Sequence, residues 1–336
     1  SYLEYTSSLD VEKHSLPSEK DSPLPSSLAV RTALLIALAA GATVLAYPPS
    51  GLGWLGAVML APIVAALESV SPRRAFLVVW VYSISTALVL VGWLAQALVG
   101  EYGVASAPAW IFTLLVVCGG SLIPATAGAL YAALRPRIPD LAAPLAFAAL
   151  WMLGEWLRAE PLGLPWLLAA HTMVRFPTAI QIADLGGSYA VGVVLVAVNA
   201  ALGIAPWRRS ALPLAGPALL AVFVGLYGIW RMGVEPGAGP AARLAVVQAA
   251  VPQDQRFKPG SAFLNTTRHV ELTRRAAQRQ KLDLVVWSET AVDIDLDKTP
   301  ALADRLGRLV DEAGVPFVTG APRSEGGVPT NSVVLF

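Results

Sequence analysis

The chain carries seven long apolar stretches, separated by short polar segments, before its pattern changes near residue 240. A helix of roughly 20 apolar residues is long enough to cross about 30 Å of hydrocarbon. We therefore predict a polytopic α-helical membrane domain with about seven spans, because seven buried core helices in succession would be unusual for a soluble domain. The stretches are Leu28–Tyr47, Gly53–Val70, Ala75–Val99, Ala107–Leu134, Leu141–Leu157, Gly187–Ala205 and Leu212–Met232.

From Arg243 onward, short β-branched runs alternate with amphipathic segments. Short apolar runs next to Pro or Gly are typical of buried strands, and apolar positions that recur every three or four residues indicate helices. The predicted strands are Arg243–Val251, the first part of Leu282–Thr290, Pro316–Gly320 and a fourth that begins at Asn331–Phe336. The predicted helices are Ser261–Lys281 and Thr299–Ala313. This alternation favours an α/β layer fold.

The charges divide the 336 residues into three segments. Residues 1–27 carry seven charges with many Ser and Pro, and we expect a disordered polar tail. Residues 28–232 form the predicted transmembrane domain, with 16 charges and no lysine up to Arg231, whereas 24 charges follow from Met232 to the end. One cysteine excludes a disulfide-stapled scaffold, and a formal net charge of +1 excludes a nucleic-acid binder.

Arginine positions predict the orientation of the spans, because positively charged short loops stay in the cytoplasm. Arginine pairs lie between spans two and three, four and five, and six and seven, while the loop between three and four has Glu101 and no positive residue. The N-terminus is therefore expected inside and the segment from residue 243 outside. Arg158 and Arg175 lie on the predicted outer side and depart mildly from the rule.

Polar residues within the spans are candidates for function, because their burial in lipid is costly. Glu155 is the clearest, and it precedes Arg158 by three residues, a spacing that suits either a structural helical ion pair or a substrate contact. Trp166 follows a Gly-Leu-Pro turn, and Gln181 precedes an Asp-Leu-Gly-Gly run that is expected to shape the mouth of a cavity. Cys118 is interpreted as a small buried apolar residue.

Glu289 is the candidate catalytic residue of the α/β segment, because it follows a buried strand and reactive groups gather at the carboxyl ends of such strands. Partial burial beside Trp287 would suit its carboxylate to general-base work. A helix N-cap or an ordinary surface carboxylate remains the alternative. The three histidines are isolated, and neither a metal cluster nor a phosphate-binding glycine loop is visible, so we expect no metal and no cofactor.

The ordered motifs resemble those of bacterial apolipoprotein N-acyltransferases, which join a membrane domain to a nitrilase-type domain. In the α/β segment the matching motifs are Val247–Gln253, Asp283–Ala291 and Asn331–Ser332. In the apolar block they are Ala46–Pro49, Gly92–Trp93, Glu155–Arg158, Gly163–Trp166, Gln181, Asp184–Gly187 and Asn199. The strongest is Trp-Ser-Glu-Thr-Ala at Trp287–Ala291, where the family usually has Pro in place of Ser288.

The resemblance implies the first half of an αββα nitrilase-like domain over residues 243–336, located in the periplasm on the bacterial inner membrane. It implies transfer of an acyl chain from a phospholipid to the N-terminal α-amino group of a diacylglyceryl-cysteine lipoprotein through a thioester. Glu289 matches the glutamate of a Glu-Lys-Cys triad, and Phe257 lies where the family often has an aromatic residue beside the active site. Trp287, Glu155, Trp166 and Gln181 are the other expected substrate-binding residues.

The Lys and Cys of that triad have no counterpart in this chain, since Lys298 lies too close to Glu289 and Cys118 belongs to the apolar block. The sequence is therefore interpreted as a fragment of a longer enzyme, and as inactive if it stands alone. Two other functions stay open. One is a non-catalytic lipid-binding or transporter-like membrane module, and the other is a membrane-tethered amidase of the nitrilase type.

Overall fold

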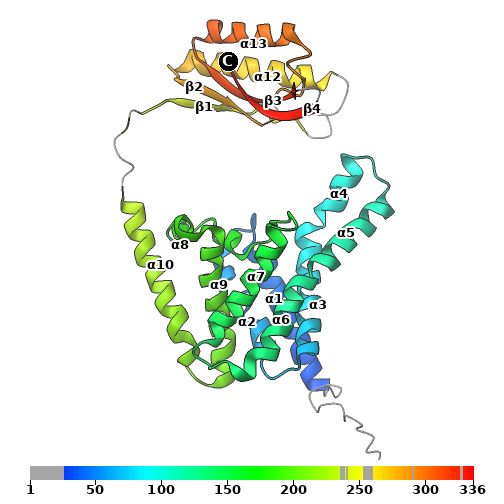
Figure 1. Ribbon diagram of the computed structural model, residues 1–336, viewed down its shortest axis with the longest axis vertical. Coiled ribbons are helices and arrows are strands. Elements are labelled where there is room, and N and C mark those ends of the chain that lie inside the picture. The colour runs from blue at the N-terminus through cyan, green and yellow to red at the C-terminus, as the bar shows by residue number, and fades with distance from the viewer. Residues whose placement is uncertain (1–25, 235–238, 240, 253–259, 290, 326–327) are drawn as a thin grey trace, which may run out of the picture. The chain divides into compact units, whose positions relative to one another are not determined.

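The computed structural model describes residues 26–234, 239, 241–252, 260–289, 291–325 and 328–336 (Figure 1). Nearly all of the predicted polar tail, and also Phe257, lie outside the described residues. The described residues form two compact units, a helical unit that ends at Val234 and an α/β unit that follows it.

The helical unit consists of long apolar helices joined by short 3-10 turns. Its first half contains α1 (Ser26–Ala46), η2 (Gly53–Ala57), α2 (Ala61–Leu67), α3 (Pro72–Val91), α4 (Trp93–Gly100) and α5 (Ser106–Gly120). Its second half contains α6 (Leu122–Leu134), η3 (Arg135–Arg137), α7 (Ala143–Ala159), η4 (Ala169–Met173), α8 (Pro177–Ile180), α9 (Ala183–Arg208), η5 (Leu212–Leu214) and α10 (Ala215–Gly233).

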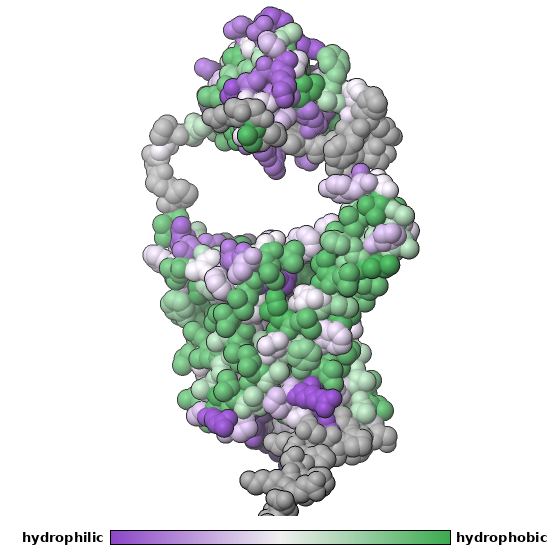
Figure 2. Space-filling model, turned by 45° about the vertical axis from the view of Figure 1, so that its right-hand side comes forward, coloured by the Kyte–Doolittle hydropathy of each residue, from purple (hydrophilic) through white to green (hydrophobic). Residues whose placement is uncertain are grey.

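Five helical segments among the described residues are long and apolar enough to cross a membrane, which agrees with a multi-pass membrane domain. They are Ser27–Ala46, Pro72–Gly100, Ser106–Arg137, Ala183–Arg208 and Leu212–Gly233. The visible surface of this unit is largely apolar (Figure 2). Two of the seven predicted stretches, Gly53–Val70 and Leu141–Leu157, form shorter helical segments that fall outside this group. The number of about seven spans stays a prediction.

The stretch Gly53–Val70 divides into the 3-10 turn η2 and the seven-residue helix α2. Its glycines explain this, since a Cβ on Gly53 would lie 2.3 Å from the Thr172 carbonyl oxygen and one on Gly56 would lie 2.2 Å from Thr172 Oγ1. The segment is thus packed against η4. The fifth stretch forms α7, whose 17 residues reach about 25 Å, at the lower end of the lengths that cross a bilayer.

One interior side chain, Asn199 on α9, joins three segments of the helical unit. Its Nδ2 donates hydrogen bonds to the Gly56 oxygen at 2.7 Å and the Leu195 oxygen at 2.8 Å, and its Oδ1 accepts from Leu60 N at 2.7 Å. The side chain is fully buried. Because backbone groups without hydrogen-bond partners are costly in an apolar interior, Asn199 stabilises the irregular connection between η2 and α2.

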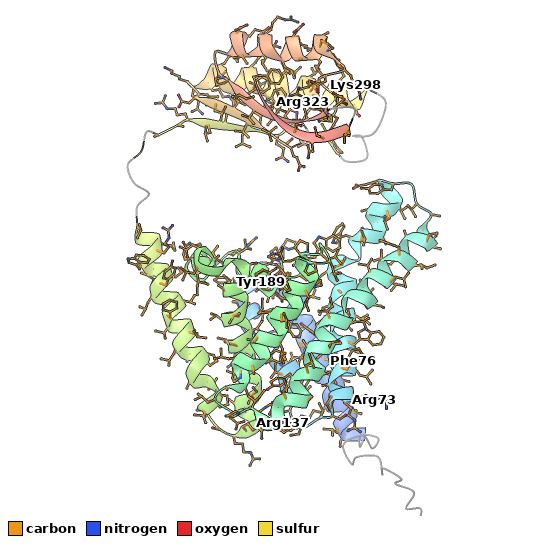
Figure 3. All side chains as sticks on the ribbon, viewed as in Figure 1. Arg73, Phe76, Arg137, Tyr189, Lys298 and Arg323 are labelled. Atoms are coloured by element: carbon orange, nitrogen blue, oxygen red, sulfur yellow. The ribbon has the colours of Figure 1, made fainter. Side chains whose placement is uncertain are left out.

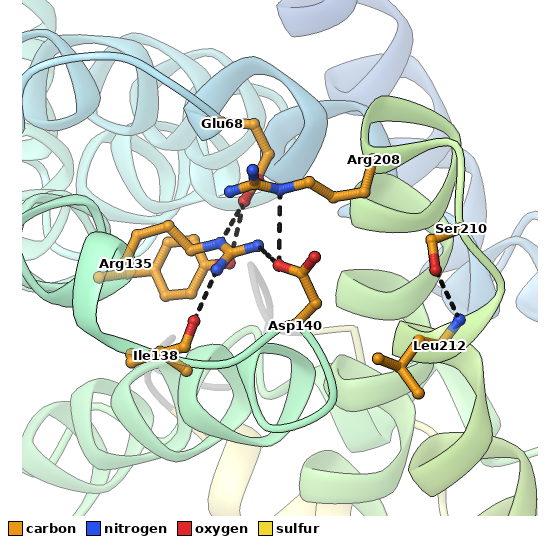
Figure 4. A network of polar contacts seen from close by, with 8 residues as sticks. Glu68, Arg135, Ile138, Asp140, Arg208, Ser210 and Leu212 are labelled. Atoms are coloured by element: carbon orange, nitrogen blue, oxygen red, sulfur yellow. Dashed lines mark hydrogen bonds and ion pairs between the residues drawn. The ribbon is translucent and has the colours of Figure 1, made fainter.

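Figure 3 places Arg73 and Arg137 at one end of the helical unit, and Tyr189 toward the other. A buried ionic network lies near the arginine end (Figure 4). Glu68 follows α2, and its carboxylate accepts from Arg135 Nε at 2.9 Å and from Arg208 Nε at 3.1 Å. Two of the arginines that predicted the orientation therefore also serve as partners of a buried carboxylate.

The α/β unit contains β1 (Leu244–Val247), α12 (Ser261–Arg279), β2 (Leu284–Trp287), α13 (Pro300–Ala313), β3 (Phe317–Glu325) and β4 (Val328–Leu335). The sheet order is β1-β2-β3-β4, with the first three strands parallel and β4 antiparallel to β3. The predicted α/β alternation is confirmed. β1 is shorter than predicted, and β3 is longer because it forms a hairpin with β4 over eight registered pairs.

The core of this unit lies on the face of the sheet that α12 and α13 cover (Figure 1). Phe317 stacks on Trp287 with ring centroids 4.6 Å apart and on Phe336 at 5.0 Å. Alternate residues on the strands point to the opposite face, where Val246 and Val333 are about 80% and 78% exposed. The sheet thus has one packed face and one apolar face that α12 and α13 leave uncovered.

Candidate functional site

Glu289 lies where the sequence predicts, two residues past the end of β2. Its side chain is exposed, in the region where the parallel strands β1, β2 and β3 have their carboxyl ends. An exposed carboxylate at that edge can reach a bound substrate, which is the first requirement for a general base.

The turn that carries Glu289 is packed directly on β3. Gly320 N donates to the Ser288 oxygen at 3.4 Å, and Val292 N donates to the Gly320 oxygen at 3.4 Å. A Cβ on Gly320 would lie only 1.4 Å from the Glu289 carbonyl oxygen. Only glycine permits this approach, so residue 320 defines where the backbone of the candidate base lies.

Two further side chains restrain the turn. Asn331 on β4 donates from Nδ2 to Glu289 Oε1 at 2.7 Å. Asn265 on α12 donates from Nδ2 to the Ala291 oxygen at 3.1 Å. The Asn331 bond holds one carboxylate oxygen, so the Glu289 side chain is oriented before any substrate arrives.

Trp287 is only 4% exposed and belongs to the core rather than to an open binding surface. Its indole Nε1 donates to Thr273 Oγ1 at 2.8 Å, and its ring also contacts His269 at a centroid distance of 5.1 Å. This packing secures the end of β2 just before Glu289. His269 is itself buried, and within the described residues its Nε2 has no hydrogen-bond partner.

The loop that follows the Glu289 turn is anchored to β3 by charge. Arg323 Nη2 donates to Asp297 Oδ1 at 2.7 Å, and Ser324 Oγ donates to Asp295 Oδ2 at 2.5 Å. These hydrogen bonds hold the pKa values of Asp297 and Asp295 below their usual range. The carboxylates therefore stay charged and serve a structural purpose. Lys298 pairs with Asp295 at 3.1 Å in the same cluster (Figure 3).

The helical unit contains a separate cavity of about 120 Å³, lined mainly by α3, α5 and α7. Glu155, Trp166 and Arg158 are among its lining residues, together with the tyrosines Tyr47 and Tyr82. The structure thus brings two of the predicted residues, Glu155 and Trp166, to one hollow. Gln181 lies elsewhere, where its Nε2 donates to the Pro177 oxygen at 3.0 Å.

Glu155 does not form the helical ion pair that its spacing suggests. Its carboxylate instead accepts from Trp151 Nε1 at 3.1 Å and from Ala169 N at 3.1 Å. No ion pair between Glu155 and Arg158 occurs in the described part of the chain. Spacing alone was misleading, because the loop that follows α7 folds back and offers a backbone N–H to the buried carboxylate.

Arg158 holds the same loop from its other side. Its guanidinium donates to the carbonyl oxygens of Leu164, Trp166 and Leu167. Trp166 packs edge-on against Trp93 with ring centroids 5.5 Å apart. The loop therefore forms a braced wall of the cavity, and Trp166 is partly exposed on it.

Cys118 is partly exposed on α5 rather than buried. Among the described residues, no group of three or more His, Cys, Asp or Glu side chains could hold a metal ion. Neither Glu68 nor the restraint of Glu289 by Asn331 and Gly320 was predicted from the sequence. For Glu68 the available signal was a carboxylate within the predicted apolar stretch Gly53–Val70.

Comparison with known proteins agrees with this architecture. The family model described as "Apolipoprotein N-acyltransferase N-terminal domain" matches residues 39–201, within the helical unit. The chain is 31% identical over 315 residues to an apolipoprotein N-acyltransferase of Chromobacterium violaceum, covering 90% of this chain and 58% of that protein. It is 33% identical over 300 residues to the one of Azotobacter vinelandii, covering 86% and 56%.

The chain belongs to the apolipoprotein N-acyltransferase family. Glu155, Trp166, Gln181 and Asn199 fall within the matched N-terminal domain, and Glu289 lies beyond it. The similarity to the Chromobacterium violaceum acyltransferase nevertheless covers nine tenths of the chain, so it continues into the α/β unit. The chain spans somewhat more than half the length of these relatives.

Proposed function

We propose that Glu289 is the general base of an enzyme that transfers an acyl chain from a phospholipid to the N-terminal α-amino group of a diacylglyceryl-cysteine lipoprotein. The observation that carries this proposal is the oriented Glu289 carboxylate, fixed at the carboxyl edge of the sheet by Gly320 and Asn331. Membership of the acyltransferase family supports the choice of reaction over other uses of a carboxylate.

The proposed chemistry runs through a thioester on a cysteine thiol. Glu289 accepts the thiol proton, the thiolate attacks the ester carbonyl of the phospholipid, and the ester C–O bond breaks while Glu289 returns the proton to the departing lysophospholipid. In the second step the lipoprotein amine attacks the thioester and forms the C–N bond as the C–S bond breaks. Glu289 accepts the proton that the amine loses and returns it to the sulfur, which regenerates the thiol. Covalent catalysis divides one slow transfer into two faster steps. The thiol and the oxyanion-stabilising lysine are not assigned to residues of this chain.

The nitrilase-type assignment of the α/β unit is part of the same proposal. It is supported by a Trp-Ser-Glu motif that begins at the last residue of β2, by parallel strands that alternate with helices, and by the position of the glutamate at the strand ends. The uncovered apolar face of the sheet is compatible with an αββα sandwich, in which such a face packs against a second sheet.

The cavity of the helical unit is proposed to hold apolar parts of the lipid substrates. Glu155 and Trp166 line it, and the loop between them is braced by Arg158. Phe257 is kept as a proposed substrate contact on the resemblance alone. The packing of Trp287 and Gln181 supports structural roles for both.

We further propose that the protein lies in the bacterial inner membrane with its α/β unit in the periplasm. The exposed arginines Arg73 and Arg137 lie at one end of the helical unit, as expected for a cytoplasmic end. Glu68 and Asp140 pair with Arg135 and Arg208. The other arginines of those loops, Arg137 and Arg209, form no ion pair among the described residues, so the loops keep a positive charge.

The test is an acyl-transfer assay on the full-length protein, with a radiolabelled phospholipid donor and a diacylglyceryl lipopeptide acceptor. Glu289→Gln should lower the transfer rate by about 10²–10⁴-fold, because it removes a general base and keeps the shape. Glu271→Gln, an exposed change on α12, is the matched control and should keep the rate. Transfer by Glu289→Gln at the wild-type rate would refute the assignment.

The same assay separates the two other functions. Label released as free fatty acid with none on the peptide would support a membrane-tethered amidase. Absence of turnover in the full-length wild-type protein would support a non-catalytic lipid-binding module. Label on the peptide amine supports the acyltransferase.

A further inference from the structure

A second hollow of about 490 Å³ lies between α8, α9 and α10, separate from the cavity that contains Glu155. Its size falls within the range of roughly 300–1,000 Å³ that is usual for small-molecule sites. The walls are aliphatic along both long helices, with Val194 and Val198 on α9 and Ala221 and Val224 on α10. We call this hollow the α8–α10 groove.

Two glycines on α10 explain why the groove exists. A Cβ on Gly228 would lie 2.0 Å from the Thr178 carbonyl oxygen, so this glycine lets α10 contact α8 directly. A Cβ on Gly225, one helical turn away, would meet nothing within 4 Å. The helices are thus held together near Thr178 and leave open space beyond it. The α10 residues that line the groove, from Ala221 to Gly225, extend about 6 Å along the helix axis.

The end of the groove near α8 carries a positive charge. Arg175 lines the groove there, together with Thr178, and is exposed. Among the described residues, no carboxylate forms an ion pair with Arg175. A guanidinium suits a phosphate, which it can bind through two parallel hydrogen bonds.

We propose that the α8–α10 groove binds an anionic glycerophospholipid, with an acyl chain between α9 and α10 and the phosphate on Arg175. Both walls belong to helices long and apolar enough to span a membrane, so a chain in the groove remains continuous with the surrounding bilayer. The neighbouring residues Leu219 and Ile229 of α10 are 73% and 67% exposed, as expected for a lipid-facing helix. The site goes beyond the acyl-transfer proposal, because it requires no reaction.

The test measures binding of dioleoylphosphatidylglycerol to the full-length protein in detergent by native mass spectrometry, without any acyl transfer. Gly225→Leu fills the groove and should raise the Kd for this lipid at least tenfold. Arg175→Gln should do the same, and should also abolish the preference for phosphatidylglycerol over zwitterionic phosphatidylcholine. Arg175 is an exposed loop residue, so this variant does not depend on repacking a helix.

Matched controls are available in the same unit. Gly216→Leu introduces the same side chain on α10 at a position that also faces open space and does not line the groove. Arg137→Gln removes an exposed arginine from the opposite end of the helical unit. Both should bind the lipid as the wild type does, and so should Glu289→Gln, whatever its effect on acyl transfer.

The proposal is overturned if the controls weaken binding as much as the groove variants do. It is also overturned if phosphatidylcholine binds the wild type as tightly as phosphatidylglycerol does. Binding of glycerol 3-phosphate with the affinity of the intact lipid would show a headgroup site for a soluble phosphate, and would likewise refute an acyl chain in the groove.

Discussion

The carbonyl oxygen of Glu289 lies so close to Gly320 that a Cβ there would be 1.4 Å away. This contact joins the end of β2 to the middle of β3. It places the candidate base by backbone packing rather than by side-chain bonds alone. We therefore expect Gly320→Ala to displace the turn, to destabilise the α/β unit by about 1–3 kcal/mol or more, and to lower acyl transfer.

Unfolding of the purified protein in urea, together with the transfer assay, measures both effects. The control is Gly307→Ala on α13, where a Cβ meets nothing within 4 Å. That change should leave activity intact and stabilise slightly, because Ala has a higher helix propensity than Gly by up to about 1 kcal/mol. Equal behaviour of the two variants would contradict the packing argument.

Because Asn331 donates a hydrogen bond to Glu289, a change at residue 331 should alter how kcat/KM for acyl transfer depends on pH. Asn331→Asp places a second carboxylate beside Glu289, which disfavours ionisation and should move the acidic limb of the kcat/KM profile to higher pH. Asn331→Leu removes the donor and should lower kcat/KM. Thr330→Ala, one residue away, should leave the limb in place. An unshifted limb in Asn331→Asp would mean that the bond does not orient the base.

The buried Asn199 provides a stability prediction for the helical unit. Asn199→Leu leaves the Leu60 N–H and the Gly56 oxygen without their partner and should cost about 1–3 kcal/mol per unsatisfied group. Thermal unfolding in detergent measures the loss. Thr126→Ala removes an exposed hydroxyl that bonds only to its own helix, so its Tm should stay close to that of the wild type.

The Glu68 network should be sensitive to the loss of its central carboxylate. Glu68→Gln removes one of the two carboxylates that pair with the buried Arg135 and leaves Asp140 as the other, so it should destabilise the helical unit by up to about 3–5 kcal/mol. Asp184→Asn breaks a much more exposed ion pair with Arg231, so a far smaller change in Tm is expected. Similar decreases in Tm in the two variants would show that burial does not determine the cost of breaking an ion pair.

Burial lowers the pKa of His269, although the Asn265 carbonyl and Asp293 act in the opposite direction. The unfolded state therefore binds the proton more readily than the folded state does. The contribution of the neutral imidazole to the free energy of unfolding is fully present above about pH 6.5, the pKa in the unfolded state. It is lost as the pH falls toward the lower pKa of the folded state. Protonation would also create a donor at Nε2, which has no acceptor among the described residues.

Hydrogen exchange of the α12 and β2 amides, corrected for intrinsic rates, should report this effect. Protection in the wild type should fall between pH 7 and pH 5, and His269→Phe should flatten the dependence while it keeps the stack on Trp287. An unchanged slope in His269→Phe would assign the pH dependence to other groups.

Short-range patterns in the sequence were sufficient to predict most helices and strands. The apolar stretches predicted α1, α3, α9 and α10, and the alternation of runs after Arg243 predicted every element of the α/β unit in the correct order. The position of Glu289 past a buried strand was also predictable. These features depend on residues close in sequence, whose spacing determines which side chains share one face of a helix or strand.

The features that these patterns did not predict depend on contacts between segments that are distant in the sequence. Gly53 and Gly56 pack on Thr172, which changes an apparent span into a turn and a short helix. The Ala169 N–H replaces Arg158 as the partner of Glu155. Asn331 reaches Glu289 across 42 residues of sequence. Such partners become neighbours only after the chain is packed, so the sequence by itself determined the elements and the tertiary structure decided which polar groups satisfy one another.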